Sequence, residues 1–231
     1  MMYCYTKSQK LDFLIPSIIL VAFIFLFHQT FLDEWLAGHF YVQGSSWIYR
    51  DNFILEKILH KDGVIFSTTI LVVVCGYWLY FWRTKKNEKH RDYLGFIVAA
   101  TVLTIVSVFF LKRWSTLPCP WDLVTFGGDR APPALWQMFS SKLPNGKCFP
   151  AGHSSGGYGF LSVYFGYTFI YGKRNFKTLI PGLLIGITFG ITQQMRGAHF
   201  LSHDLTTILI SILSSWVTSL VYFYYNRNYE N

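Results

Sequence analysis

The sequence predicts an all-α integral membrane protein, a six-helix bundle that forms a single domain over residues 1–231. The chain is 52% hydrophobic and 19% aromatic, a balance that favours a membrane protein over a soluble one. Its basic residues, which give a net charge of +8, gather in short clusters between apolar segments. Such clusters orient membrane helices. Because they do not form one basic face, we expect no nucleic-acid partner.

Six segments are apolar enough to cross a bilayer, which takes roughly 20 residues of helix. They cover residues 12–28, 64–82, 93–111, 154–171, 178–193 and 205–225. The first follows two lysines, as the apolar part of a signal peptide does, but bulky residues follow it in place of a small-residue cleavage pattern. We therefore expect it to remain as a helix. The fifth contains Pro181 and three glycines, which lower helix propensity but let neighbouring helices pack closely.

Lysine and arginine place four regions on the cytoplasmic side of the membrane. These basic residues are Lys7, Lys10, Arg83, Lys85, Lys86, Lys89, Arg91, Lys173, Arg174, Lys177 and Arg227. The opposite face then carries residues 29–63, 112–153 and 194–204. In the first of these loops, apolar and aromatic residues alternate irregularly with charged ones, which predicts a helix lying on the membrane surface.

The candidate catalytic residues all fall on this non-cytoplasmic face. Residues 195–204 hold an arginine, two histidines and a carboxylate directly before the sixth segment, and His153 precedes the fourth. Ionisable groups at the edge of a bilayer are costly and so indicate chemistry. Removing phosphate from a lipid without a metal needs cations, a nucleophile and an acid. Histidine suits the last two tasks because it titrates near neutral pH, and Lys112 and Arg196 suit the first.

The residues from Lys112 to Asp204 resemble the signature of the type-2 phosphatidic acid phosphatase superfamily of membrane lipid phosphatases. That signature reads Lys-x6-Arg-Pro, then Pro-Ser-Gly-His, then Ser-Arg-x5-His-x3-Asp. Here Lys112 begins the first part, residues 150–153 form the second, and His199 anchors the third. The chain departs from the signature at five polar positions, which hold Cys119, Ala151, Thr192, Gln193 and His203 in place of arginine, serine, serine, arginine and aspartate.

The resemblance implies a metal-independent lipid phosphatase without a cofactor. His199 would attack phosphorus to form a phosphohistidine. His153 would protonate the leaving group and then activate the water that releases phosphate. Lys112 and Arg196 would hold the phosphate oxygens, together with the amide of Gly152, which lies near a helix start where anions bind.

The departures from the signature leave two roles to be filled. We expect Arg196 to replace the arginine missing at Gln193, because it lies only three residues before His199. Either Arg113 or Arg130 is expected to replace the arginine missing at Cys119.

The residue that orients His199 is open between two neighbours. The resemblance implies a side chain four residues further on that holds the non-attacking ring nitrogen and so fixes the tautomer. On a helix, that position shares the face of His199 and is His203. Asp204 is the only carboxylate close by and lies about 100° further round the helix. Geometry favours His203, with Asp204 as the alternative.

A metal site is the competing interpretation of the same cluster. His199 and His203 match a metal-binding pair at i and i+4, with His153, Asp204 or a cysteine as further ligands. No glutamate lies beside them to serve as a base, so the sequence favours the metal-free chemistry.

The four cysteines divide by compartment. Cys4 falls on the reducing side and Cys75 inside a helix, whereas Cys119 and Cys148 share the outer loop, where a disulfide is allowed. Sequence does not supply the separation of their Cα atoms, so a bridge and two unpaired thiols both stay open.

The leading function is hydrolysis of a phosphomonoester or diphosphate on a membrane lipid. The alternatives are transfer of the phosphate to a second lipid and non-catalytic lipid binding or transport. The expected partners are a lipid phosphate substrate and membrane lipids. The size and the compact six-span plan favour a bacterial inner membrane, with the active site facing the periplasm, and a eukaryotic secretory membrane is the alternative. Phosphatidylglycerol phosphate, polyprenyl diphosphate and lipid A all present phosphate at the same depth, so the lipid stays open.

Overall fold

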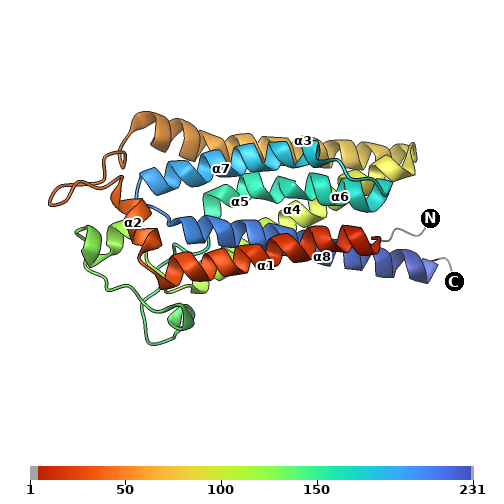
Figure 1. The fold of residues 1–231 in the computed structure, drawn as a ribbon. Coiled ribbons are helices and arrows are strands. Elements are labelled where there is room, and N and C mark those ends of the chain that lie inside the picture. The colour runs from red at the N-terminus through yellow and green to blue at the C-terminus, as the bar shows by residue number, and fades with distance from the viewer. Residues whose placement is uncertain (1–4, 230–231) are drawn as a thin grey trace.

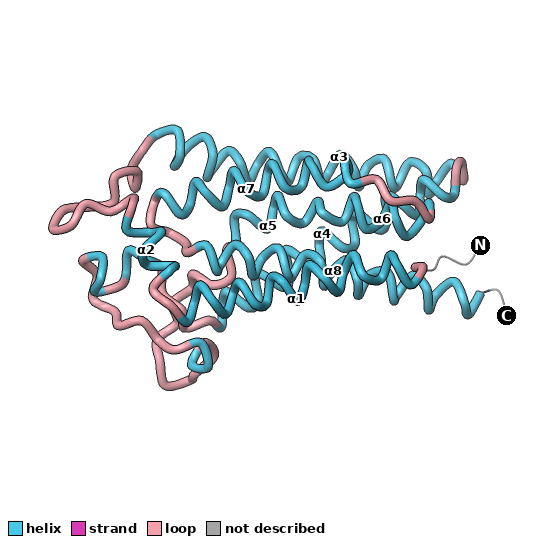
Figure 2. Tube along the Cα trace, viewed as in Figure 1, coloured by secondary structure: helices cyan, strands magenta, loops and turns pink. Residues whose placement is uncertain are grey.

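The computed structural model describes residues 5–229, and every extended regular element within that range is a helix (Figures 1 and 2). The all-α prediction is confirmed. The longer elements are α1 (Lys7–Gln29), α2 (Leu32–Gly38), the π-helix η1 (Ile54–Asp62), α3 (Gly63–Thr84), α4 (Glu88–Trp114), α5 (Gly152–Tyr158), α6 (Ser162–Tyr171), α7 (Ile180–Met195) and α8 (Leu201–Tyr229). Short 3-10 turns lie at Pro120–Asp122, Val124–Phe126, Leu135–Gln137, Gly159–Leu161 and Phe176–Leu179. Cys4 lies outside the described residues.

Five helical stretches among the described residues are long and apolar enough to cross a membrane. They are Gln9–Gln29, Ile54–Thr84, Glu88–Trp114, Phe176–Met195 and Leu201–Tyr225. Many large apolar side chains on α1 and α3 point outward, including Phe25 and Val72, which are more than 60% exposed. An outward apolar surface of this kind suits helices that face lipid.

The expected span over residues 154–171 is interrupted. Its first part, α5, ends at Tyr158, and a 3-10 turn separates it from α6. Glycines bring α5 against α7 here, because a Cβ at Gly157 would overlap the backbone of Gly186. Close contacts at glycine stabilise the packing of α5 against α7. Glycine inside a helix also lowers the stability of that helix.

The second span begins earlier than residue 64. The π-helix η1 runs directly into α3, and Ile54–Thr84 forms one helical stretch long and apolar enough to cross a membrane. The short helix α2 also lies within residues 29–63, and the expectation of a surface helix there stays a prediction. A Cβ at Gly63 would lie 2.7 Å from Cε1 of Phe189, so glycine at the η1–α3 junction permits close approach to α7.

The bundle has two different ends (Figure 1). The α3–α4 connection, the α6–α7 connection, the start of α1 and the end of α8 lie together at one end, and both connections carry clusters of basic residues. The other end carries α2 and the irregular residues 115–151, and we call it the loop end (Figure 2). The end of α4 and the starts of α5 and α8 also lie there, so the sequence motifs meet at the loop end.

Candidate active site

Hydrogen bonds to backbone carbonyl groups join the separate motif segments at the loop end. The amide of Ala151 donates to the carbonyl oxygen of His203 at 3.3 Å, and Oγ1 of Thr207 donates to the carbonyl oxygen of Ala151 at 3.0 Å. These contacts attach the start of α5 to the first turns of α8. The amide of Trp121 donates to the carbonyl oxygen of Gly197 at 3.0 Å, which attaches the outer loop to the α7–α8 connection.

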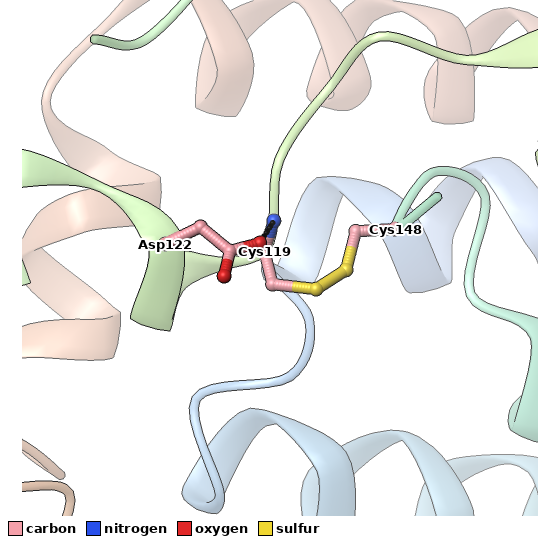
Figure 3. Close-up of side chains that lie close together, drawn as sticks. All are labelled: Cys119, Asp122 and Cys148. Atoms are coloured by element: carbon pink, nitrogen blue, oxygen red, sulfur yellow. Dashed lines mark hydrogen bonds between the residues drawn. A yellow bond between two sulfur atoms is a disulfide. The ribbon is translucent and has the colours of Figure 1, made fainter. Parts of the chain in front are cut away.

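A disulfide between Cys119 and Cys148 holds the outer loop (Figure 3). Their Cα atoms are 5.1 Å apart, within the range that a bridge requires. Asp122 accepts a hydrogen bond from the amide of Cys119 at 3.3 Å, and Sγ of Cys148 lies 3.4 Å from the carbonyl oxygen of Ala198. The two sulfurs bond to each other and offer no thiolate to a metal. The open question of cysteine pairing is therefore decided in favour of the bridge.

Reducing this disulfide is expected to destabilise the loop end. The bridge closes a 29-residue separation, which in the chain-entropy account corresponds to about 3–4 kcal/mol. The Cys119→Ser and Cys148→Ser double variant should therefore unfold at a lower temperature than wild type, as followed by circular dichroism in detergent. Cys75→Ser is the matched control, because Cys75 is an unbridged cysteine in α3. An unchanged unfolding temperature in the double variant would contradict a structural role for the bridge.

Lys112 and His153 face the site from α4 and α5. Lys112 is half-buried in the last turn of α4, and a Cβ on Gly152 would lie 3.2 Å from its Nζ. The ammonium group therefore lies beside the backbone that precedes His153. Nδ1 of His153 is buried and has no hydrogen-bond partner among the described residues. The arrangement places a cation beside the backbone of the residue before His153 and leaves Nδ1 of that imidazole without a partner among the described residues.

His199 lies in the connection between α7 and α8 and is 3% exposed. The connection needs a glycine at Gly197, which has φ of +76° and lies directly against the ring of Trp47. Burial lowers the pKa of His199 well below its ordinary value, and the charges of Lys112, His203 and His153 act in the same direction. The backbone of Cys148 acts in the opposite direction and raises this pKa. At neutral pH, His199 is therefore an uncharged imidazole, which is the nucleophilic form.

His199 and His203 do not share a face of one helix, because α8 begins at Leu201 and His199 precedes it. The expectation from helical periodicity is therefore wrong. Asp33 of α2 caps the start of α8: its Oδ1 accepts a hydrogen bond from the amide of Ser202 at 3.1 Å. Burial raises the pKa of Asp33 to about 6, and its hydrogen bonds to Ser202 oppose the rise. A cap contributed by a distant helix is not visible in the local sequence.

His203 nevertheless lies beside His199. The two ring centroids are 5.7 Å apart with an edge-to-face geometry, and the rings of Phe149 and Phe200 also pack against His203. Nδ1 of His199 and Nδ1 of His203 are both buried without a hydrogen-bond partner among the described residues. The contact between these rings is therefore one of packing.

Asp204 is turned toward α7. Its Oδ2 accepts a hydrogen bond from Nε2 of Gln194 at 2.7 Å, and a Cβ at Gly190 would lie 2.8 Å from its carboxylate. Asp204 is fully buried, with its Oδ1 unpartnered among the described residues. Its observed partner is thus Gln194, and the structure gives it no hydrogen bond to His199.

Arg196 is buried, with 8% of its surface exposed. Its Nε donates to the carbonyl oxygen of Arg50 at 2.9 Å, and its Nη1 donates to Oε1 of Gln193 at 3.4 Å. The guanidinium group therefore reaches the residue that stands at the signature's arginine position. Its charge also acts on His153, which places it within electrostatic reach of the site.

Of the two candidates for the arginine missing at Cys119, Arg113 lines a pocket with Lys112, and Arg130 reaches that pocket through Asn145. Arg113 is exposed and lines a pocket of about 400 Å³ together with Lys112, Lys147 and Asn145. Nη1 of Arg130 donates to the carbonyl oxygen of Asn145 at 3.2 Å. Both arginines thus adjoin one basic pocket at the loop end.

Sequence reasoning missed His60. Its ring centroid lies 3.8 Å from that of His153, with the ring planes 40° apart. It comes from η1, a segment expected on the membrane surface, and no motif in the sequence indicated it. Only the approach of η1 to α5 in the folded chain identifies this neighbour.

An apolar cavity of about 260 Å³ adjoins His153 between α3, α4 and α5. Its lining includes Val64, Leu71, Ile105, Gly152, His153 and Phe160. The imidazole of His153 therefore borders a cavity whose apolar lining suits a hydrocarbon chain.

A family model for the PAP2 superfamily matches residues 92–227. The chain belongs to the PAP2 superfamily. The matched region runs through α4 to α8 and contains Lys112, His153 and His199, so the resemblance expected from the motifs is confirmed. Members of this superfamily are generally phosphoric ester hydrolases, which supports a phosphatase-type function. Searches of curated proteins and of solved structures find no match.

Proposed function

We propose that this PAP2 protein hydrolyses a phosphomonoester or diphosphate of a membrane lipid through a phosphohistidine at His199. The observation that carries the proposal is the gathering of Lys112, His153 and His199 at the loop end. His199 is an uncharged, buried imidazole with an unpartnered nitrogen, and His153 presents a second one. An uncharged imidazole as nucleophile and a second, protonated imidazole as acid meet the needs of nucleophilic attack and acid–base catalysis on a phosphate, with Lys112 as the cation.

In the proposed reaction, a nitrogen of His199 attacks phosphorus and the bond from phosphorus to the lipid oxygen breaks. His153, in its protonated form, donates a proton to that oxygen, and the lipid alcohol or monophosphate leaves. His153 then takes a proton from water, whose oxygen attacks the phosphohistidine and frees inorganic phosphate. Lys112, Arg196 and the amide of Gly152 hold the phosphate oxygens as negative charge develops on them. No step in this sequence uses a metal or a cofactor.

The position of the site supports a lipid substrate. The apolar cavity beside His153 lies between candidate membrane helices, so a hydrocarbon chain there would leave its phosphate next to Lys112. We propose that α5 and α6 together make a sixth crossing, since residues 152–171 match the length a bilayer needs, roughly 20 residues. The basic residues at the opposite end favour a loop end on the non-cytoplasmic side, and we propose that the membrane is a bacterial inner membrane.

The decisive experiment measures phosphate release from a panel of lipid substrates. Purified protein in mixed micelles would be given lipid phosphomonoesters and diphosphates with long chains, short-chain analogues of the same headgroups, and a soluble aryl phosphate. We expect release from at least one long-chain lipid, with a higher KM for its short-chain analogue because the analogue buries less apolar surface. Binding of the lipids without any release would contradict hydrolysis and favour the non-catalytic alternative.

Product analysis separates hydrolysis from phosphotransfer. A donor lipid carrying labelled phosphate would be supplied together with unlabelled acceptor lipids. Hydrolysis predicts that the label appears as inorganic phosphate, because water takes the phosphoryl group from His199. Appearance of the label on a second lipid would replace hydrolysis with transfer through the same intermediate.

A further inference from the structure

The segment that carries His60 is held against the active-site end of α7. The π-helix η1 packs against α3 and α7, and Gly63 at its end fits under the ring of Phe189. Just before η1, the carbonyl oxygen of Arg50 accepts the hydrogen bond from Nε of Arg196. Two attachments therefore fix this segment relative to the proposed site.

Within that segment, His60 is the residue that meets the catalytic histidine. The 3.8 Å separation of the ring centroids brings the rings of His60 and His153 into direct contact. Glu56 lies four residues before His60 on η1, but its carboxylate is paired with Lys61 at 2.8 Å. Nδ1 of His60 and Nδ1 of His153 have no hydrogen-bond partner among the described residues. The contact between them is thus made by ring faces, with these nitrogens left unbonded.

We propose that His60 is a positioning residue whose ring covers one face of His153 and fixes the direction in which that imidazole presents its nitrogens to the lipid phosphate. This inference rests on the proposed function, since it assumes that His153 transfers the proton. A proton donor must lie within hydrogen-bonding reach of the leaving oxygen. His153 has no bonded partner at Nδ1 to fix its ring, so packing from His60 supplies the constraint.

The test distinguishes the effect of the aromatic ring of His60 from the effect of its nitrogen atoms. His60→Ala removes the ring, His60→Gln retains polar atoms without a ring, and His60→Phe retains an aromatic face without nitrogens. We expect kcat for lipid phosphate release to fall about tenfold in the alanine and glutamine variants, the effect of a misplaced proton donor. KM should change little, and His60→Phe should recover most of the lost kcat. His39→Ala is the matched control, because His39 is an exposed histidine at the same end of the chain's fold.

Three results would overturn the inference. The first is a kcat in His60→Ala equal to that of wild type. The second is an equal loss in His60→Phe and His60→Ala, which would show that the nitrogens of His60 matter and its face does not. The third is a further loss when His60→Ala is added to His153→Ala, because a residue that acts through His153 has no effect once that imidazole is gone.

A second measurement does not depend on activity. In protein labelled at histidine ring carbons, the resonance of His153 is identified by its disappearance in His153→Gln. His60→Ala should shift this resonance because the neighbouring ring is lost, and His60→Phe should shift it less. An unmoved resonance would overturn the contact even if no substrate is found. Conversely, a wild-type protein that releases no phosphate would contradict the proposed function and leave the spectroscopic result to decide the contact.

Discussion

His199→Ala is expected to abolish phosphate release, with a fall in kcat of at least about 10³-fold, because the variant loses the atom that bonds to phosphorus. We expect neither His153 nor His203 to substitute for it. His153 belongs to a different helix and has the proton-transfer role, and His203 is enclosed by Phe149 and Phe200. The measurement is the initial rate of phosphate release from the best lipid of the panel.

Loss of activity must be separated from loss of fold. His199 is buried in the connection that the Cys119–Cys148 bridge contacts, so its removal leaves a small cavity. Thermal unfolding of His199→Ala beside wild type and His39→Ala measures that effect directly. A folded His199→Ala protein with full activity would rule out the phosphohistidine.

The protonation state of His199 supplies an independent check. Because burial and the neighbouring cations lower its pKa, the uncharged ring persists at pH values where an exposed histidine, with a pKa of about 6.5, is half protonated. The ring resonances of His199, assigned by their absence in His199→Ala, should therefore stay fixed as the pH falls from about 8 to about 6. A titration centred on the ordinary histidine pKa would contradict the buried, uncharged nucleophile.

Much of the fold could be predicted from the sequence, because the length and hydropathy of a segment are properties of that segment alone. The stretches around residues 12–28, 93–111 and 205–225 each lie within an observed apolar helix. Residues 154–171 could not be predicted correctly in this way. Their hydropathy favours one helix, but contact between Gly157 and Gly186 belongs to the packed bundle, and the helix is interrupted next to it.

The site was predictable only where its residues belong to a sequence pattern. Lys112, His153 and His199 stand in a recognisable order, and their placement at helix ends predicted a common face. The contact of His60 with His153 and the cap that Asp33 provides to α8 could not be predicted from the spacing of residues along the chain. Each joins segments more than 90 residues apart. The start of α8 at Leu201 depends on that cap, so the relation between His199 and His203 could not be inferred from helical periodicity.

The second large effect is expected at His203. Of the two candidate orienting groups, only the ring of His203 has an observed contact with His199 among the described residues. His203→Ala should therefore let the nucleophile turn away from phosphorus. We expect kcat to fall by roughly 10²-fold or more, on the scale seen when a residue that orients a catalytic histidine is lost. KM should change less, because the phosphate-holding groups Lys112 and Arg196 are retained.

Asp204→Asn provides the matched comparison one position along the helix. The amide oxygen of asparagine can still accept the hydrogen bond from Gln194, so the variant removes the charge while it preserves the observed contact. We expect a smaller loss of kcat than in His203→Ala. If Asp204→Asn abolished turnover and His203→Ala did not, the carboxylate would be the orienting group. The first turn of α8 would then have to rotate during catalysis to bring Asp204 from Gln194 to His199, and its bond with Gln194 would have to break first.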